Sequence, residues 1–174
     1  MLTLADIGWE KVAALLAAYG LSLVRVVDDA PIPGSYWGEP EAGVIGDKVH
    51  ARGDTPVHSL LHEACHLIVA DPQRRSRIHT DASDSQAEED ATCYLQILLG
   101  DALAGVGRKQ IMADMDTWGY TFRLGCTCAW FERDAEDARA WLADRDLLPD
   151  ACTGNAVPLA CTEEFHGDHP CNAG

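Results

Sequence analysis

The residues best suited to chemistry form the run His62-Glu63-Ala64-Cys65-His66, which has the pattern H-E-x-x-H. On an α-helix, two histidines four positions apart differ by about 40° around the axis, so both imidazoles project from one side and can share a metal ion. Zinc suits two imidazoles and a carboxylate, which leave a fourth position for water. Glu63 projects from the same side, where it can act on that water as a general base.

The helix that must present this motif has signals at both ends. Thr55 as N-cap and Pro56 as the first helical residue predict its start. Asp71-Pro72 predicts its end near residue 70. On a helical wheel the apolar residues form one stripe on the side away from the motif. We therefore expect the stripe to pack into the core while the histidines and the glutamate face a cleft.

The third metal ligand should come from a second helix, expected over about residues 86–99. Glu88 is the first choice, because it lies on a face of this helix that can lean over a neighbouring packed helix. Glu89 and His79 are the alternatives. Ser85 and Glu88 also fit a capping box, in which the glutamate would only bind a backbone N–H group at the helix start.

Two runs carry a resemblance to a known family: the segment 60–66 around the motif, and Glu88-Glu89-Asp90-Ala91-Thr92-Cys93-Tyr94-Leu95. Together they resemble the ImmA/IrrE-type gluzincin metallopeptidases, whose second helix has the form Glu-x-x-Ala-Asn-x-Phe-Ala. The resemblance covers about residues 35–100 and places the zinc glutamate of the family on Glu88, although Thr92 replaces the usual asparagine. It implies strands ahead of the active-site helix, one of which could hold an extended peptide by strand addition.

The order His-Glu-x-Cys-His over residues 62–66 is also similar to the SprT-like zincins. In that family a downstream histidine is the third ligand, and His79 would take this role. The glycine and aromatic positions that usually follow that histidine are absent, since Thr80-Asp81-Ala82 come next. The acidic charge of the chain argues against the DNA-associated role of that family, so this resemblance is the second choice.

A zinc hydrolase usually needs a hydrogen-bond donor for the oxyanion of the tetrahedral intermediate. His79, Tyr120 and Tyr36 are the candidates, and the sequence does not choose among them. Asp114 or Asp116 could instead orient a ligand imidazole through a hydrogen bond.

His58 lies one turn before His62, on roughly the same side of the helix. Because it is close to the helix start, we expect its imidazole at the protein surface. The alternative is that it lines the cleft beside the metal.

The end of the chain has no periodicity, so we expect one domain over residues 1–150 and an irregular tail over 151–174. The spacing of the Cys and His residues in this tail matches no standard zinc finger, so we expect one catalytic zinc and not a second, structural ion. A tail thiol or imidazole could instead occupy the open zinc position and hold the enzyme inactive. The tail ligands are Cys161, His166, His169 and Cys171, and no role is assigned to Cys126, Cys128 or Cys152.

Composition places this 174-residue chain among ordinary globular domains, with 47% hydrophobic and 24% charged residues. Its net charge of −15 disfavours binding to nucleic acid or to anionic membranes. The sequence contains no apolar run of about 18 residues and no secretory signal at its start. We therefore expect a cytoplasmic protein whose partner is a peptide or protein substrate.

These signals predict an α+β, zincin-like fold in which a small sheet packs on the metal helix and the glutamate helix, with a helical C-terminal part. The expected helices cover about residues 4–19, 56–70, 86–99, 108–117 and 135–146, and the expected strands lie at 21–27, 44–45 and 49–51. The expected activity is that of a zinc metallopeptidase, with His62, His66 and Glu88 as metal ligands and Glu63 as general base for zinc-activated water. The alternative is a non-catalytic zinc-binding interaction or regulatory module on the same fold.

Overall fold

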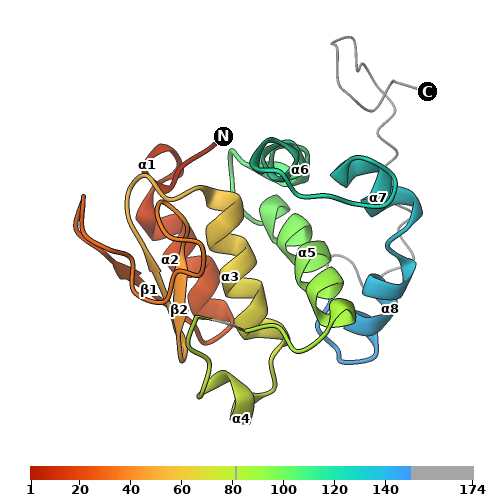
Figure 1. Ribbon diagram of the computed structural model, residues 1–174, viewed down its shortest axis with the longest axis horizontal. Coiled ribbons are helices and arrows are strands. Elements are labelled where there is room, and N and C mark those ends of the chain that lie inside the picture. Colours follow the sequence, from red (N-terminus) through yellow and green to blue (C-terminus); the bar gives the residue numbers. More distant parts are fainter. Residues whose placement is uncertain (81, 150–174) are drawn as a thin grey trace.

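Two antiparallel helices, α3 (Val57–Val69) and α5 (Gln86–Asp101), form the centre of the molecule (Figure 1). The computed structural model describes residues 1–80 and 82–149. Every residue of α3 is buried except His62, which is half-buried. The apolar residues of this helix are buried as expected, and the polar residues His62, Glu63 and His66 line a pocket and not an open, solvated surface.

A three-stranded sheet lies beside α3 and confirms the mixed α+β class. Its strands are β1 (Ser22–Arg25), β2 (Gly43–Ile45) and β3 (Lys48–Ala51), in the order β1-β3-β2. β3 pairs in parallel with β1 and antiparallel with β2.

The outer edge of β2 is covered by the chain's own backbone. Thr80 N–H donates to the Val44 carbonyl, and Gly46 N–H donates to the Ile78 carbonyl. A peptide could add to this edge only by displacing the segment 78–80, because an added strand needs the same backbone groups.

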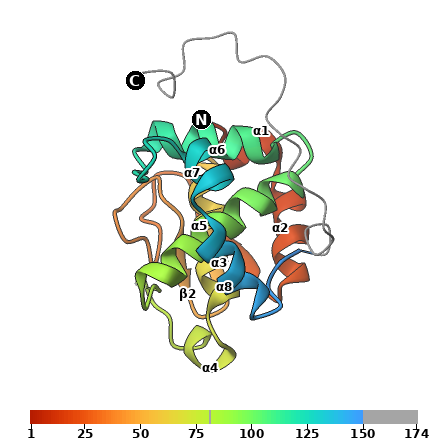
Figure 2. The ribbon, with the colours of Figure 1, turned by 90° about the vertical axis from the view of Figure 1, so that its right-hand side faces the viewer.

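The remaining helices surround this centre. Figure 1 shows α1 and α2 on the side of the sheet, while Figure 2 shows α7 and α8 in front of α5. The single N-terminal helix expected from the sequence is broken at Gly8, whose φ of 92° interrupts the helix. The two short helices α4 and α7 were not predicted. The bounds are α1 Leu4–Ile7, α2 Trp9–Ala18, α4 Pro72–Arg75, α6 Gly107–Trp118, α7 Thr127–Arg133 and α8 Glu136–Ala143.

The ends of the two central helices test the expected capping residues. Ser85 caps α5 as predicted, since its hydroxyl accepts from the Glu88 N–H group at 3.3 Å. Thr55 does not cap α3, because its hydroxyl accepts from the backbone N–H of Arg52 at 3.0 Å. Gly100 does not end α5 but lies inside it, where a Cβ atom would come within 2.6 Å of Cγ1 of Ile111. This glycine therefore allows α5 and α6 to approach closely.

In the described part of the chain, no helix is both long enough and apolar enough to cross a membrane. The tail of residues 151–174, with its cysteines and histidines, lies outside the described residues. The predictions about a second zinc site or an inhibitory thiol in the tail therefore stay predictions.

Candidate metal centre

Three side chains converge where α3 and α5 pack together. The two Nε2 atoms of His62 and His66 lie 3.0 Å apart. The carboxylate of Glu89 approaches both, with 3.3 Å from Oε1 to His62 Nε2 and 3.6 Å from Oε2 to His66 Nε2. Two nitrogen ligands and one carboxylate thus meet at one point, with all three ligand atoms within 4.8 Å of one another.

The spacing of these atoms fits a zinc ion. Zinc bonds of about 2.0–2.1 Å at tetrahedral angles place neighbouring ligand atoms about 3.3 Å apart. The observed separations of 3.0, 3.3 and 3.6 Å are close to this value. Three protein ligands would also leave the open fourth position that distinguishes catalytic from structural zinc sites.

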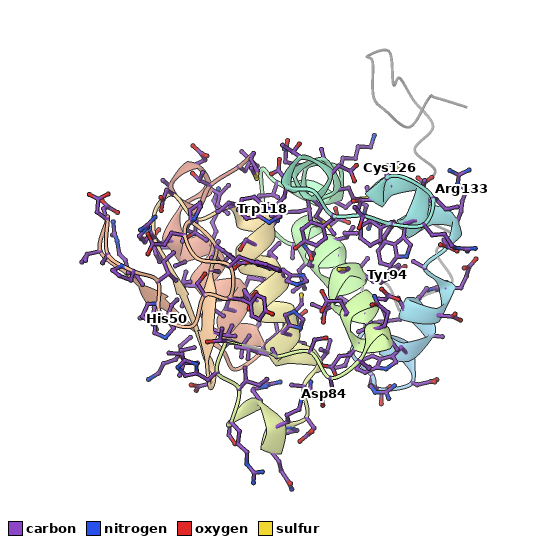
Figure 3. The ribbon with its side chains drawn as sticks, in the orientation of Figure 1. His50, Asp84, Tyr94, Trp118, Cys126 and Arg133 are labelled. Carbon is purple, nitrogen blue, oxygen red and sulfur yellow. The ribbon has the colours of Figure 1, made fainter. Side chains whose placement is uncertain are left out.

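Glu88 does not lie with the histidines. Its carboxylate is buried and forms an ion pair with Arg74, which also pairs with Asp84. Asp84 lies between α4 and the start of α5 (Figure 3), whereas Arg74, the cation that binds Glu88, belongs to α4. Because neighbouring helix residues project about 100° apart, the carboxylate of Glu89 is the one that reaches the imidazoles. The structure thus brings together His62, His66 and Glu89.

Two buried polar residues of α5 orient the imidazoles. The side-chain oxygen of Gln96 lies 2.9 Å from Nδ1 of His62, and the hydroxyl of Thr92 lies 3.5 Å from Nδ1 of His66. Both side chains are fully buried. Together with Glu89 they lie at positions i, i+3 and i+7, which share one helical face. Neither partner was predicted from the sequence, although polar residues along one face of an apolar helix are a signal that could have identified them.

The charges of the three converging groups favour a cation between them. Burial lowers the pKa of His66, so its imidazole is a free base. Burial also lowers the pKa of His62, but its interactions with Tyr120, Cys93 and Glu89 outweigh burial and raise this pKa well above its usual value. For Glu89, burial raises the pKa, but its hydrogen bond to His62 and the charges of both histidines hold it well below its usual value. The centre thus holds a positive charge beside an ionised carboxylate, and a metal ion can replace that proton.

Glu63 lies next to this centre and is buried, with 6% of its surface exposed. Burial raises the pKa of its carboxyl group to about 8. Its Oε2 atom has no hydrogen-bond partner among the described residues. A buried carboxyl group with a raised pKa and a free oxygen is suited to taking up and releasing a proton near neutral pH.

A pocket of about 440 Å³ opens onto these groups. Of the three expected oxyanion donors, Tyr120 and Tyr36 line this pocket, whereas the exposed His79 does not. The Tyr120 ring lies 5.7 Å from the ring of His62, centroid to centroid. The described lining residues are Tyr36, Trp37, Glu41, His62, Glu63, His66, Thr80, Ala82, Ser83, Glu89, Trp118, Gly119 and Tyr120.

His58 is fully buried, so the expectation of a surface imidazole is wrong. Its ring packs 5.1 Å from the ring of Trp118 and 5.9 Å from that of Tyr120, and its Nε2 atom lies 3.2 Å from the sulfur of Met1. Burial lowers its pKa to about 4. The C-terminal end of α6 and the N-terminus of the chain cover the start of α3, which a reading of that helix alone does not reveal.

The two aspartates considered as partners of the ligand imidazoles bind elsewhere. Asp114 accepts from the backbone N–H of Leu2 at 3.0 Å, and Asp116 accepts from both the backbone and the hydroxyl of Thr127. Both therefore connect α6 to other parts of the chain.

Comparison with family models, curated proteins and solved structures finds no match to this chain.

Proposed function

We propose that this protein is a zinc-dependent metallopeptidase of the gluzincin type, with His62, His66 and Glu89 as metal ligands. One observation carries the proposal: three ligand atoms meet at the spacing of a zinc tetrahedron, beside a buried carboxyl group that has no partner. The same arrangement favours Glu89 over Glu88 as the carboxylate ligand, because Arg74 neutralises Glu88.

The residues around the centre have distinct roles in this proposal. A bound zinc ion would polarise a carbonyl group and lower the pKa of water. Glu63 takes a proton from the attacking water and delivers it to the leaving nitrogen of the amide. Tyr120 is the better placed of the two tyrosine donors, because its half-buried ring lies against His62 in the pocket. Its hydroxyl would donate to the oxyanion.

The choice of peptide as substrate has separate support. The resemblance of the two helices to ImmA/IrrE-type metallopeptidases favours amide hydrolysis. The pocket is open at the surface and wide enough for a side chain and adjoining backbone, as hydrolysis of a polymer requires.

The substitution Glu63→Gln tests the proposal, because it keeps the shape of the side chain and removes its ability to take a proton. Wild-type protein, Glu63→Gln and His62→Ala would each be loaded with zinc and incubated with a mixed peptide library, with new termini read by mass spectrometry. We expect Glu63→Gln to lose at least about 100-fold in turnover while it keeps about one zinc per chain. His62→Ala should lose both zinc and turnover.

Two results would contradict the proposal. If zinc-loaded wild-type protein cleaves no peptide but binds zinc, the non-catalytic zinc-binding module is the better description. If Glu63→Gln cleaves as fast as wild type, Glu63 is not the general base.

A further inference from the structure

Exposed aromatic side chains gather at the mouth of the pocket. Among the described residues, six large hydrophobic side chains are exposed, and three of them line this one pocket. These three are Tyr36 (57% exposed), Trp37 (80%) and Trp118 (37%), and we refer to them as the aromatic rim. Large apolar groups that collect on one exposed surface usually mark a binding site.

The aromatic rim is held in place by the groups around it. The rings of Tyr36 and Trp37 pack edge to face, with centroids 4.9 Å apart. The buried carboxylate of Glu41 accepts from the backbone N–H of Trp37 at 2.8 Å and from the hydroxyl of Ser35. At the end of α6, Trp118 packs against His58 near the N-terminal end of α3 (Figure 3). The backbone of Trp37 is therefore anchored by Glu41, and each ring of the aromatic rim has one aromatic neighbour, which lowers the entropy cost of binding.

The ionisable side chains that line the pocket carry carboxyl groups, imidazoles and tyrosine hydroxyls. Its lining contains the carboxyl groups of Glu41, Glu63 and Glu89, and no Lys or Arg is among the described residues that line it. Oε2 of the buried Glu63 is aimed at no protein partner in the described chain. Glu89 is directed at the two histidines, and Oε2 of Glu41 already accepts from Trp37 and Ser35, so Oε1 of Glu41 is the carboxylate oxygen that remains for a ligand at the rim. The net charge of −15 on the whole chain adds a long-range attraction for cations.

Aromatic faces beside a carboxylate match one kind of side chain. A guanidinium or ammonium group is attracted by the faces of Trp and Tyr rings and by an anionic oxygen. An apolar side chain could cover the rings but would leave the carboxylate of Glu41 without compensation for its lost water. An acidic side chain would be repelled by the carboxylates.

We propose that the pocket selects peptides that carry an arginine or lysine side chain beside the bond to be cleaved, with the cation held between the aromatic rim and Glu41. This inference rests on the proposed function for its reference to cleavage. The selection of a cationic side chain can be measured without cleavage, so the two proposals can fail separately.

The first test is a binding measurement on zinc-loaded Glu63→Gln protein, which cannot turn over its ligand. Three peptides, acetyl-Ala-Ala-X-Ala-Ala-amide with X as arginine, norleucine or glutamate, would be titrated by isothermal calorimetry. We expect the arginine peptide to bind about tenfold more tightly than the norleucine peptide. One cation–π contact and one charge pair together supply a difference in binding free energy of this size. The glutamate peptide should bind most weakly.

Two further substitutions identify the groups responsible. Glu41→Gln removes the charge but keeps an oxygen that can accept from Trp37 and Ser35, and Trp37→Ala removes one ring of the rim. Each should reduce the preference for arginine over norleucine to about threefold or less. The matched control is Glu132→Gln on α7, which removes an exposed carboxylate outside the pocket lining and should leave the preference unchanged.

The outcomes separate the two proposals. Equal affinity for arginine and norleucine peptides, or no detectable binding of any of them at millimolar concentration, would overturn the inference. So would an arginine preference that both substitutions leave intact. If the arginine peptide binds selectively but the wild-type zinc protein never cleaves it, the cation site stands and the peptidase proposal fails. If wild-type protein cleaves all three peptides equally well, the peptidase proposal stands and the inference fails.

Discussion

The side-chain oxygen of Gln96 lies 2.9 Å from Nδ1 of His62, across the interface between α5 and α3. An amide oxygen can only accept, so Nδ1 carries the hydrogen and the lone pair of a neutral His62 is on Nε2, the atom that faces Glu89. The amide nitrogen of Gln96 donates to the carbonyl of His58 at 3.2 Å, which fixes the orientation of the amide. One buried glutamine thus sets both the tautomer and the direction of the His62 imidazole.

Gln96→Ala should therefore weaken metal binding without removing a ligand. Loss of a hydrogen bond that orients a ligand histidine typically costs 10- to 100-fold in metal affinity, and we expect a loss of about this size. A competition titration with a chromogenic zinc chelator measures it. Gln86→Ala, at the exposed start of the same helix, is the control and should bind zinc as wild type does. Equal affinities for Gln96→Ala and wild type would show that the hydrogen bond does not orient the ligand.

The neighbouring carboxylates Glu88 and Glu89 should differ sharply in their effect on metal content. Glu89→Gln should lose zinc, because it removes the anionic ligand atom near His62 and His66. Glu88→Gln should keep about one zinc per chain, since its partner is Arg74. Inductively coupled plasma mass spectrometry on both variants and on wild type gives the result. Loss of zinc only in Glu88→Gln would return the third-ligand role to Glu88.

His58 should make the fold sensitive to acid. Its pKa of about 4 in the folded protein is below the value of about 6.5 expected in the unfolded chain. Between these values the unfolded state binds more protons, so the stability that this group contributes is present above pH 6.5 and is lost as the pH falls toward 4. The full effect is at most about 3 kcal/mol.

The measurement is the free energy of unfolding in urea between pH 4 and 7.5, with EDTA present so that zinc release does not contribute. His58→Phe keeps a ring against Trp118 and should show a shallower dependence on pH than wild type. His79→Ala, which removes an exposed imidazole, is the control. If the free energy of unfolding of His58→Phe depends on pH as steeply as that of wild type, His58 is not the source of the acid sensitivity.

Gly100→Ala should destabilise the protein, because its new Cβ would come within 2.6 Å of Cγ1 of Ile111. Overpacking of this kind typically costs about 1–3 kcal/mol, even though alanine is intrinsically the better helix former. Urea unfolding of Gly100→Ala, Ile111→Ala and the double variant measures the cost. The double variant should be more stable than the sum of the two single effects predicts, since Ile111→Ala removes the atom in conflict. Additive effects would show that the two helices do not meet at this point.

Local chemistry determined much of this protein directly from its sequence. The sequence predicted the three strands and the helices α3, α5, α6 and α8 to within a few residues. Their signals are contained in the segments themselves. It also brought His62 and His66 together, since four positions on a helix fix their direction before any other contact forms. Ser85 caps α5 for the same reason, because its partner is only three residues away.

Tertiary structure decided the features that depend on distant partners. Glu88 and Glu89 have the same side chain and adjacent positions, and Arg74, from the short helix α4, determines which carboxylate is neutralised and which reaches the imidazoles. His58 is buried because Trp118 and Met1 cover it. The physical reason is common to both cases. A helix fixes the direction in which each side chain projects, whereas the charge or apolar surface that it meets there comes from residues far away in the sequence.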